Sequence, residues 1–206
     1  MRRIVFFFII STSFFLTNQL FSQSNDEPQV LLGSSLTSIS GFGGFLMEFS
    51  QVNGKIGVST GGGGAVLFNQ VFYFGGYGLG QNSEYEYVNP EDSLVNADLG
   101  FGHGGFWIGV ITRPKKLIHF DVSTKLGWGN IALNEREYTF RTILNDKVFV
   151  AIPQVEVELN IAHWFRINGG VGYRFVTGVN NSEFGVEDFN SPEFSLSFLF
   201  GWYKDY

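Results

Sequence analysis

The chain has no cysteine among its 206 residues. This absence excludes disulfides, thiolate metal ligands, a cysteine nucleophile and a lipid-modified cysteine anchor. Charged residues make up only 16% of the chain, against a usual value of about 25%. No run of consecutive apolar residues approaches the roughly 18 that a transmembrane helix needs. The apolar stretch at the N-terminus is also shorter than this. The formal net charge of −6 disfavours nucleic acid as a partner, because its recognition requires a basic surface.

Glycine and aromatic residues are abundant instead. The chain holds 27 glycines, and aromatics make up 17% of it. Four consecutive glycines occupy Gly61 to Gly64, but the lysine, the Ser/Thr and the helix of a phosphate-binding loop do not follow them. A flexible linker would be flanked by polar low-complexity sequence. Because glycines inside strands permit sharp bends, we interpret this run as a bend in one strand of a small closed barrel.

The N-terminus has the order of a secretory signal. Two arginines precede a Phe/Ile-rich stretch, and small and polar residues follow it. We expect cleavage near Ser22 or Gln23, which makes 1–23 a signal peptide, 24–40 an N-terminal polar segment and 41–206 the folded domain. Loss of the two arginines changes the formal charge from −6 to −8. An uncleaved N-terminal anchor is the alternative.

Apolar and polar residues alternate with period two along much of the remaining chain. In IHFDVSTKLGWG, at 118–129, the apolar side chains occupy even numbers and the charged ones odd numbers. The same alternation runs through 155–161, 165–175 and 194–203. This period is typical of half-buried β-strands. We predict eight strands, near 43–51, 55–68, 71–80, 99–112, 116–132, 149–161, 164–177 and 193–203.

The connections between these strands alternate in length. Tight turns are predicted at 69–70, 113–115 and 162–163, and they fall at the same end of the strands. Three of the four connections at the other end are long and polar, at 81–98, 133–148 and 178–192. An even number of strands with short turns at one end and long loops at the other is typical of bacterial outer-membrane barrels. We therefore predict an all-β fold, an eight-stranded antiparallel up-and-down transmembrane β-barrel.

Alternation alone does not decide which face of the barrel is polar, because a soluble lipocalin-like barrel would turn its apolar face inward and a membrane barrel would turn it outward. Four acids and four bases on the polar face favour the membrane, since they can pair within a narrow lumen. Aromatics also recur eight residues apart on the apolar face, about 20 Å in height at a tilt of ~40°, near the ~25 Å apolar band of such barrels. The expected polar lumen network is Glu48, Lys55, His119, Asp121, Lys125, Glu156, Glu158, Arg166 and Arg174. The expected lipid-facing aromatics are Phe120, Trp128, Phe165, Tyr173, Phe194 and Trp202.

The chain resembles a group of small glycine-rich outer-membrane β-barrel proteins of Bacteroidota-type bacteria. The resemblance rests on GFGGFLMEFSQVNGKIGVSTGGGGAVLFNQVFYFGGYGLG (41–80), GFGHGGFWIGVI (100–111), KLIHFDVSTKLGWGNIAL (116–133) and WFRINGGVGYRFVTGV (164–179). It implies the fold and an outer-membrane location, and it assigns no catalytic or binding residues. The alternation before the C-terminus is similar to the terminal strand signal of outer-membrane proteins, although Lys204 departs from that pattern.

Few residues point to chemistry. His119, Asp121 and Ser123 share a strand face, but side chains at i and i+4 of a strand lie about 13 Å apart, too far for a catalytic triad. We expect them to belong to the lumen network instead. His103 lies in a glycine-rich strand and His163 at a tight turn, and three histidines without cysteine disfavour a transition-metal site. No cofactor is expected.

Two of the three predicted long loops, 81–98 and 178–192, are acidic, and 133–148 is mixed in charge. The candidate carboxylates of the acidic loops are Glu84, Glu86, Glu91, Asp92, Glu183, Glu187 and Asp188. They could bind divalent cations or a basic partner, or they could simply be solvated. We expect a non-enzymatic outer-membrane barrel with a structural or surface-interaction role through long acidic extracellular loops. Outer-membrane lipid, the assembly machinery and an unknown surface ligand are its expected partners.

Two other functions stay open from the sequence. One is a membrane-embedded lipid-modifying enzyme, which needs a serine or histidine near a rim and an acid on a neighbouring strand. The other is a soluble periplasmic barrel that binds an apolar ligand. A transport pore is disfavoured, because eight strands leave no aqueous channel.

Overall fold

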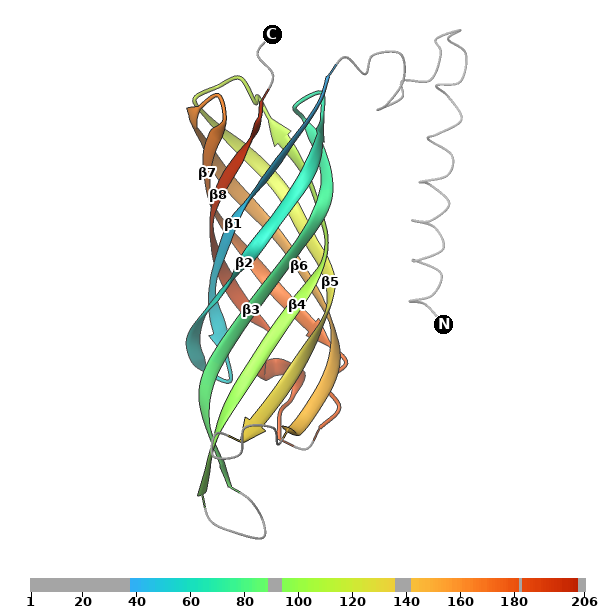
Figure 1. The fold of residues 1–206 in the computed structure, drawn as a ribbon, viewed down its shortest axis with the longest axis vertical. Coiled ribbons are helices and arrows are strands. Elements are labelled where there is room, and N and C mark those ends of the chain that lie inside the picture. The colour runs from blue at the N-terminus through green and yellow to red at the C-terminus, as the bar shows by residue number, and fades with distance from the viewer. Residues whose placement is uncertain (1–37, 89–93, 136–141, 182, 204–206) are drawn as a thin grey trace, which may run out of the picture. The chain divides into compact units, whose positions relative to one another are not determined.

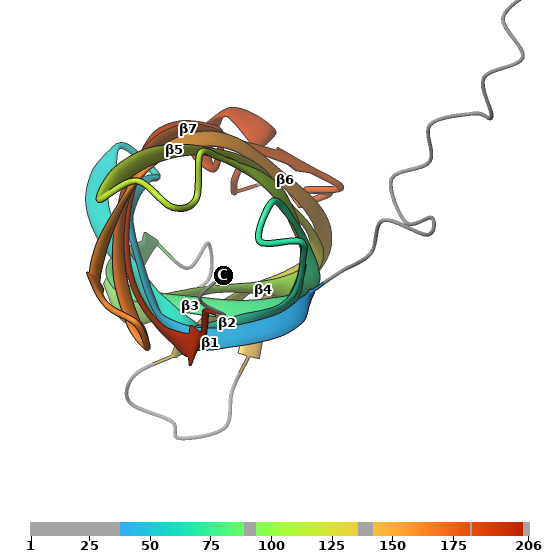
Figure 2. The same cartoon turned by 90° about the horizontal axis from the view of Figure 1, so that it is seen from above.

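One antiparallel sheet closes on itself in the computed structural model, which describes residues 38–88, 94–135, 142–181 and 183–203. Each strand pairs with its neighbours in sequence, and the last strand returns to pair with the first (Figures 1 and 2). The strands are β1 (Ile39–Val52), β2 (Lys55–Phe68), β3 (Phe72–Val88), β4 (Leu94–Thr112), β5 (Ile118–Glu135), β6 (Thr142–Ala162), β7 (Phe165–Thr177) and β8 (Ser191–Trp202). A short 3₁₀-helix, η2 (Val186–Asp188), precedes β8. The predicted eight-stranded antiparallel up-and-down barrel is confirmed.

The segment before the barrel is not described. The predicted signal peptide, 1–23, lies outside the described residues, as does all but the end of the polar segment 24–40. β1 begins at Ile39, slightly before the predicted start of the domain. Within the described ranges, no helix has the length and apolar character needed to cross a membrane.

The two ends of the barrel differ. The β2–β3, β4–β5 and β6–β7 turns lie at one end with the start of β1 and the end of β8, and we call it the turn end (Figure 1). We call the opposite end the loop end. There β1 and β2 join through Asn53 and Gly54, whose φ angles of 49° and 72° are typical of a type I′ hairpin turn. Asn69 and Gln70, at the turn end, also have positive φ angles, of 51° and 61°.

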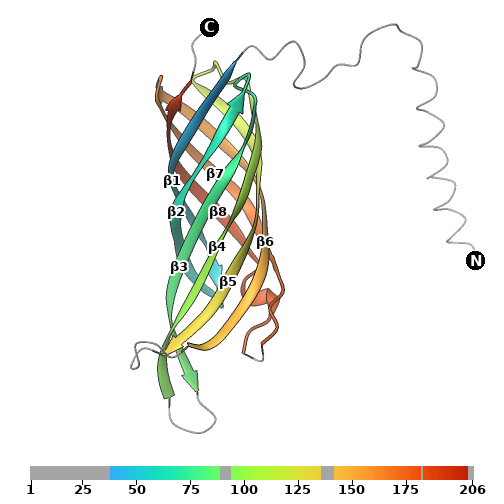
Figure 3. The same ribbon diagram turned by 45° about the vertical axis from the view of Figure 1, so that its right-hand side comes forward.

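Two of the predicted long loops are largely strand, and this prediction is wrong. β3 and β4 pair as far as Val88 opposite Leu94, so most of 81–98 is a hairpin that projects beyond the rest of the loop end (Figures 1 and 3). β5 and β6 likewise extend over most of 133–148. A hairpin beyond the barrel wall has solvent on both faces, so its sequence need not alternate and reads as a polar loop.

The four glycines lie inside β2, which runs unbroken through them. None of them has a positive φ angle. A Cβ atom added at Gly61 would lie 2.0 Å from the carbonyl oxygen of Gly78 on β3, so the two backbones approach too closely there for any side chain. The strand location is confirmed, and close backbone approach is the reason that the structure supplies for glycine at this position.

Side chains fill the lumen in three groups. An aromatic cluster of Phe42, Tyr73, Trp107 and Tyr203 occupies one side of the turn end, with ring centroids 5.4–6.4 Å apart. Charged residues of β5, β6 and β7 occupy the other side of that end. The loop-end apolar cluster consists of Val52, Ala97, Leu99, Phe101, Ile131, Leu133, Val148, Val150, Ile152, Val176, Phe184 and Phe189.

Candidate functional site

Eight of the nine predicted lumen residues lie inside the barrel, and none of the eight exposes more than 3% of its surface. Seven of them form what we call the charged cluster: Glu48, His119, Asp121, Lys125, Glu156, Glu158 and Arg166. The eighth, Arg174, lies nearer the loop end, where its side chain bonds to the end of β1. The polar face of the alternating pattern is therefore the inner face of the wall.

Lys55 is the exception, and its predicted place in the lumen is wrong. It is the first residue of β2, directly after the Asn53–Gly54 turn, and its side chain is exposed. Its number has the same parity as that of Ser59, which is buried in the lumen. The wall ends at the turn, however, so an inward position there has no lumen around it.

Glu193 is a buried carboxylate that the sequence analysis missed. It is 4% exposed, and within the described residues neither of its oxygens accepts a hydrogen bond from a basic or amide donor. Its number is opposite in parity to that of outward-facing Phe194, and this signal could have found it. Among the described residues, the buried acids are Glu48, Asp121, Glu156, Glu158 and Glu193, and the buried bases are Lys125, Arg166 and Arg174. The predicted balance of four acids and four bases is therefore wrong, because acids outnumber bases by five to three.

Lys125 is the central cation of the charged cluster. Its Nζ lies 2.8 Å from Oε1 of Glu48, which reaches it from β1 on another part of the wall. The same atom donates to Oε1 of Gln154 on β6 at 3.1 Å. A buried ammonium is tolerated only when it is paired and hydrogen-bonded. Lys125 therefore ties three strands together through the lumen.

Glu158 is shared by two partners on neighbouring strands. Its Oε1 lies 2.7 Å from Nε2 of His119 on β5 and also accepts a hydrogen bond from Arg166 on β7. The Nδ1 atom of His119 lies 3.1 Å from the carbonyl oxygen of Lys116. Both ring nitrogens of His119 are thus engaged, and neither faces a serine.

His119, Asp121 and Ser123 bond to different partners. Asp121 accepts a hydrogen bond from Tyr73 at 2.8 Å. Ser123 donates to Glu156 at 3.2 Å and accepts from the indole N–H of Trp107 at 3.4 Å. As the strand spacing predicts, the three side chains form no chain of contacts among themselves. They connect the charged cluster to the aromatic cluster instead.

The segment between β7 and β8 closes the loop end. Arg174 donates to the carbonyl oxygen of Phe189 at 2.9 Å, to Oγ of Ser50 at 2.6 Å and to the carbonyl oxygen of Gln51 at 2.6 Å. Phe184 and Phe189 are 4% and 0% exposed within the loop-end apolar cluster. The predicted polar loop 178–192 therefore also closes the mouth of the barrel, and we call the part of it between β7 and β8 the plug segment.

The acidic residues of the predicted loops have different placements. Glu84 and Glu86 belong to β3, so their assignment to a loop is wrong. Glu91 and Asp92 lie outside the described residues. Glu183 and Glu187 are exposed. Asp188 is half-buried at the end of η2, where its carboxylate accepts a hydrogen bond from the backbone N–H of Gly185 at 2.8 Å.

The six predicted lipid-facing aromatics all lie on the outer face. Five are exposed and Phe165 is partly covered by the rings of Trp164 and Phe200. Neighbouring outer rings also touch in a row across β3 to β6, formed by Phe74, Phe106, Trp128 and Phe149. The outer wall is thus covered by aromatic and aliphatic side chains.

The remaining histidines give no sign of a metal centre. His103 is buried in the lumen, where its Nδ1 lies 3.1 Å from the hydroxyl of Tyr77. His163 lies at the β6–β7 turn, as predicted. Over the described part of the chain, no group of three or more His, Cys, Asp or Glu side chains is arranged to hold a metal ion.

Comparisons with known proteins do not assign the chain to a family. No protein-family model matches it, and no curated protein is significantly similar in sequence. Among solved structures, it is similar to Ail, the attachment invasion locus protein of Yersinia pestis, in complex with the heparin analogue sucrose octasulfate. That similarity has a TM-score of 0.47 at 10% identity and covers 79% of this chain and 96% of Ail. A second structure of Ail gives a TM-score of 0.44 at 11% identity, with 79% and 95% covered.

Proposed function

We propose that the chain is an outer-membrane β-barrel without enzymatic activity, which presents its loop end outside the cell as a surface for interaction. One observation carries this proposal: the barrel is apolar outside and charged inside. Val157 is 43% exposed on the outer wall of β6, while Glu156 and Glu158 on either side of it are each 1% exposed in the lumen. Water on the outside would not favour this arrangement, whereas lipid would.

The orientation follows from the connections. In outer-membrane barrels the short turns face the periplasm and the longer connections face outward. The turn end would then be periplasmic, and the β3–β4 hairpin and the plug segment would be outside. The expected partners are outer-membrane lipid around the wall, the assembly machinery during insertion and a surface ligand at the loop end. The exposed side chains of Glu183 and Glu187 would contribute negative charge to that surface.

A closed interior supports a structural or interaction role over transport. The largest fully buried side chains include Trp107, Arg174, Tyr73, Phe101 and Lys125, and they all point into the lumen. The plug segment covers one mouth, and Tyr203 packs against the aromatic cluster at the other. An eight-stranded barrel filled in this way has no room for an aqueous path.

The geometry gives little support to the two alternative functions, a lipid-modifying enzyme and a soluble barrel for an apolar ligand. A lipid-modifying enzyme would require a base with a free nitrogen beside a nucleophile. Both nitrogens of His119 are engaged, and His103, whose Nε2 has no partner among the described residues, is buried beside Tyr77 and Phe101. A soluble barrel for an apolar ligand would require Glu156, Glu158, Arg166 and Arg174 on the outside, and all four are buried.

The proposal is tested by fractionation of the cell envelope. We expect the protein in the outer membrane, with a shift of electrophoretic mobility on boiling. An epitope inserted between Asn53 and Gly54, at the loop end, should bind antibody on intact cells. The matched insertion between Asn69 and Gln70, at the turn end, should bind only after the cells are opened. Recovery in the soluble periplasmic fraction would refute the proposal.

A further inference from the structure

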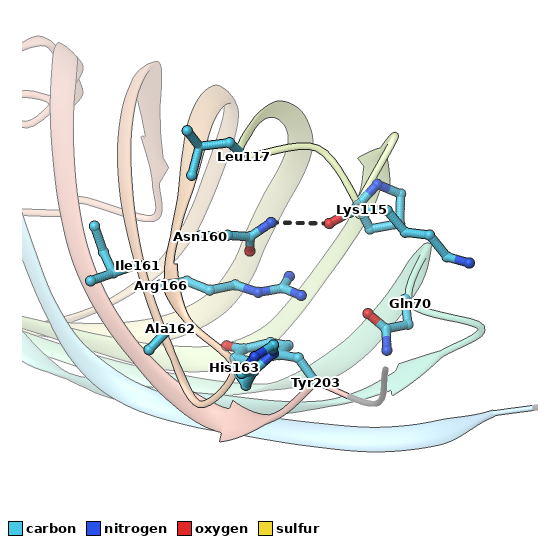
Figure 4. Close-up of a pocket in the computed structure, with 10 residues that line it drawn as sticks. Gln70, Lys115, Leu117, Asn160, Ile161, Ala162, His163, Arg166 and Tyr203 are labelled. Atoms are coloured by element: carbon cyan, nitrogen blue, oxygen red, sulfur yellow. Dashed lines mark hydrogen bonds between the residues drawn. The ribbon is translucent and has the colours of Figure 1, made fainter. Parts of the chain in front are cut away.

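The turn end holds a cavity of about 520 Å³ between the β4–β5 turn, the β6–β7 turn and the residue that follows β8 (Figure 4). Lys115, His163 and Arg166 line it, and no aspartate or glutamate of the described residues does. The β4–β5 turn, the β6–β7 turn and the start of β7 thus bring basic groups to one place. The charged cluster described above contributes only Arg166 to this cavity.

Arg166 projects into the middle of the cavity, between the β4–β5 turn and Tyr203 (Figure 4). It is 3% exposed, and its guanidinium lies over the ring of Tyr203, with Cζ 3.4 Å from the ring centroid. One terminal nitrogen donates to Glu158, but Nε has no hydrogen-bond partner among the described residues. A buried guanidinium N–H of a residue that lines the cavity therefore lacks an acceptor within the described part of the chain.

Tyr203 supplies a second donor of the same kind. It is 8% exposed, its ring stacks on Phe42 at 6.4 Å, and its hydroxyl has no hydrogen-bond partner among the described residues. Buried donors without acceptors are unfavourable and rare in folded proteins. Two such donors that line one cavity indicate that a ligand with acceptor oxygens belongs there.

The rest of the cavity suits an anion attached to an apolar group. Asn160 donates to the carbonyl oxygen of Pro114 at 3.1 Å (Figure 4). It also donates to the carbonyl oxygen of Lys116 at 2.7 Å, so both carbonyl dipoles are already engaged. Leu117 and Ile161 form an apolar edge, and they are 65% and 50% exposed. The cavity therefore connects basic donors with the apolar exterior of the barrel.

We propose that this cavity binds a phosphate-bearing anion. Arg166 and Tyr203 donate to the phosphate oxygens, and Lys115 adds positive charge at the edge. A lipid headgroup and free phosphate share this chemistry, and the apolar edge favours the lipid. The lipid source rests on the membrane insertion proposed above, whereas the phosphate site itself does not.

Tyr203→Phe is the sharpest test, because it removes only a hydroxyl that has no partner within the protein. The full chain is folded in detergent, inorganic phosphate is titrated by calorimetry, and bound short-chain phosphatidylglycerol is measured by native mass spectrometry. We expect Tyr203→Phe to weaken binding about tenfold or more, as for a lost hydrogen bond to a charged group, with unchanged stability in urea.

Two lysines of the same turn provide a matched pair. Lys115→Gln should weaken binding of both probes, because Lys115 lines the cavity. Lys116→Gln should not, because the Lys116 side chain is exposed and does not line the cavity. Equal effects of the two substitutions would mean that general surface charge attracts the anion, and this would overturn the assigned site.

The two probes separate the sources of the phosphate. Binding of phosphatidylglycerol alone would support a lipid site that needs the apolar edge, and binding of both probes would support recognition of the phosphate itself. Failure of both probes to bind, or wild-type affinity in Tyr203→Phe, would overturn the inference. A protein that binds phosphate but fractionates as soluble would refute membrane insertion and leave the phosphate site intact.

Discussion

Val157→Arg should destabilise the barrel in lipid by about 2–4 kcal/mol. Val157 faces outward from β6, which ends five residues later (162 − 157) at Ala162. At ~3.3 Å per residue and a tilt of ~40°, this places Val157 about 13 Å from the turn end. The apolar band of an outer-membrane barrel is ~25 Å tall, so Val157 lies close to its middle, where a cation is most costly.

Ile161→Arg is the matched control. Ile161 lies on the same strand and the same face, is 50% exposed, and precedes the end of β6 by a single residue. A lysine or arginine near the membrane interface costs only about 0–1 kcal/mol, because its charge reaches water. Both variants are compared with wild type by urea unfolding in phospholipid vesicles, with the folded fraction measured from the mobility of unboiled samples.

The difference between the two variants is the critical quantity. If Val157→Arg is as stable as wild type, the outer wall does not contact lipid and the assignment of faces fails. If both substitutions cost the same amount, the effect arises from local packing and not from depth in a membrane. Either result would remove the main support for the proposed function.

Three further predictions concern the packed lumen, each measured by the same unfolding assay. Glu193→Gln should stabilise the barrel by about 1 kcal/mol, because it neutralises a buried carboxylate that accepts no hydrogen bond among the described residues. Glu158→Gln should instead cost about 3–5 kcal/mol, because it leaves the guanidinium of Arg166 without its anionic partner. Equal effects of the two substitutions on stability would contradict the assigned pairing. Phe189→Ala should cost about 3–5 kcal/mol and expose the plug segment to protease, and an unchanged digestion pattern would argue against a plug. Gly109→Ala should cost about 1–3 kcal/mol of stability by overpacking the lumen, whereas Gly80→Ala should be neutral because a Cβ atom there would have open space around it. A neutral Gly109→Ala would show that the lumen is not tightly packed at this position.

The strand positions were predictable because the two faces of each strand have different surroundings, the lumen on one side and the exterior of the barrel on the other. In 155–161 every second residue is apolar and lies on the outer wall, where all but Leu159 are exposed, and the others are polar and mostly buried. The ends of the strands were not predictable on this basis. Polar residues dominate 81–86, so this segment reads as a polar loop although it pairs with β4.

Parity along each strand was enough to indicate most of the predicted lumen residues, and it also points inward at Glu193, which the prediction left out. It fails at Lys55, the first residue of β2, because at a strand end the position of the mouth decides whether an inward direction means burial. The plug segment and the cavity at the turn end could not be predicted from the sequence, for a different reason. Arg166 and Tyr203 meet only because β7 and β8 pair and the chain turns inward after Trp202.

Packing of the lumen also accounts for part of the abundance of glycine. Gly109 on β4 lies directly opposite Tyr73 on β3, and a Cβ atom at Gly109 would lie 2.3 Å from Cζ of that ring. The ring cannot move aside easily, because its hydroxyl bonds to Asp121 and its faces contact other aromatic rings. Gly127 on β5 is similar, since its Cβ atom would lie 2.7 Å from the hydroxyl of Tyr77. In a lumen this narrow, large aromatic and charged side chains on some strands require the absence of side chains on the strands they face. These glycines and the buried tyrosine rings are therefore two parts of one packing solution.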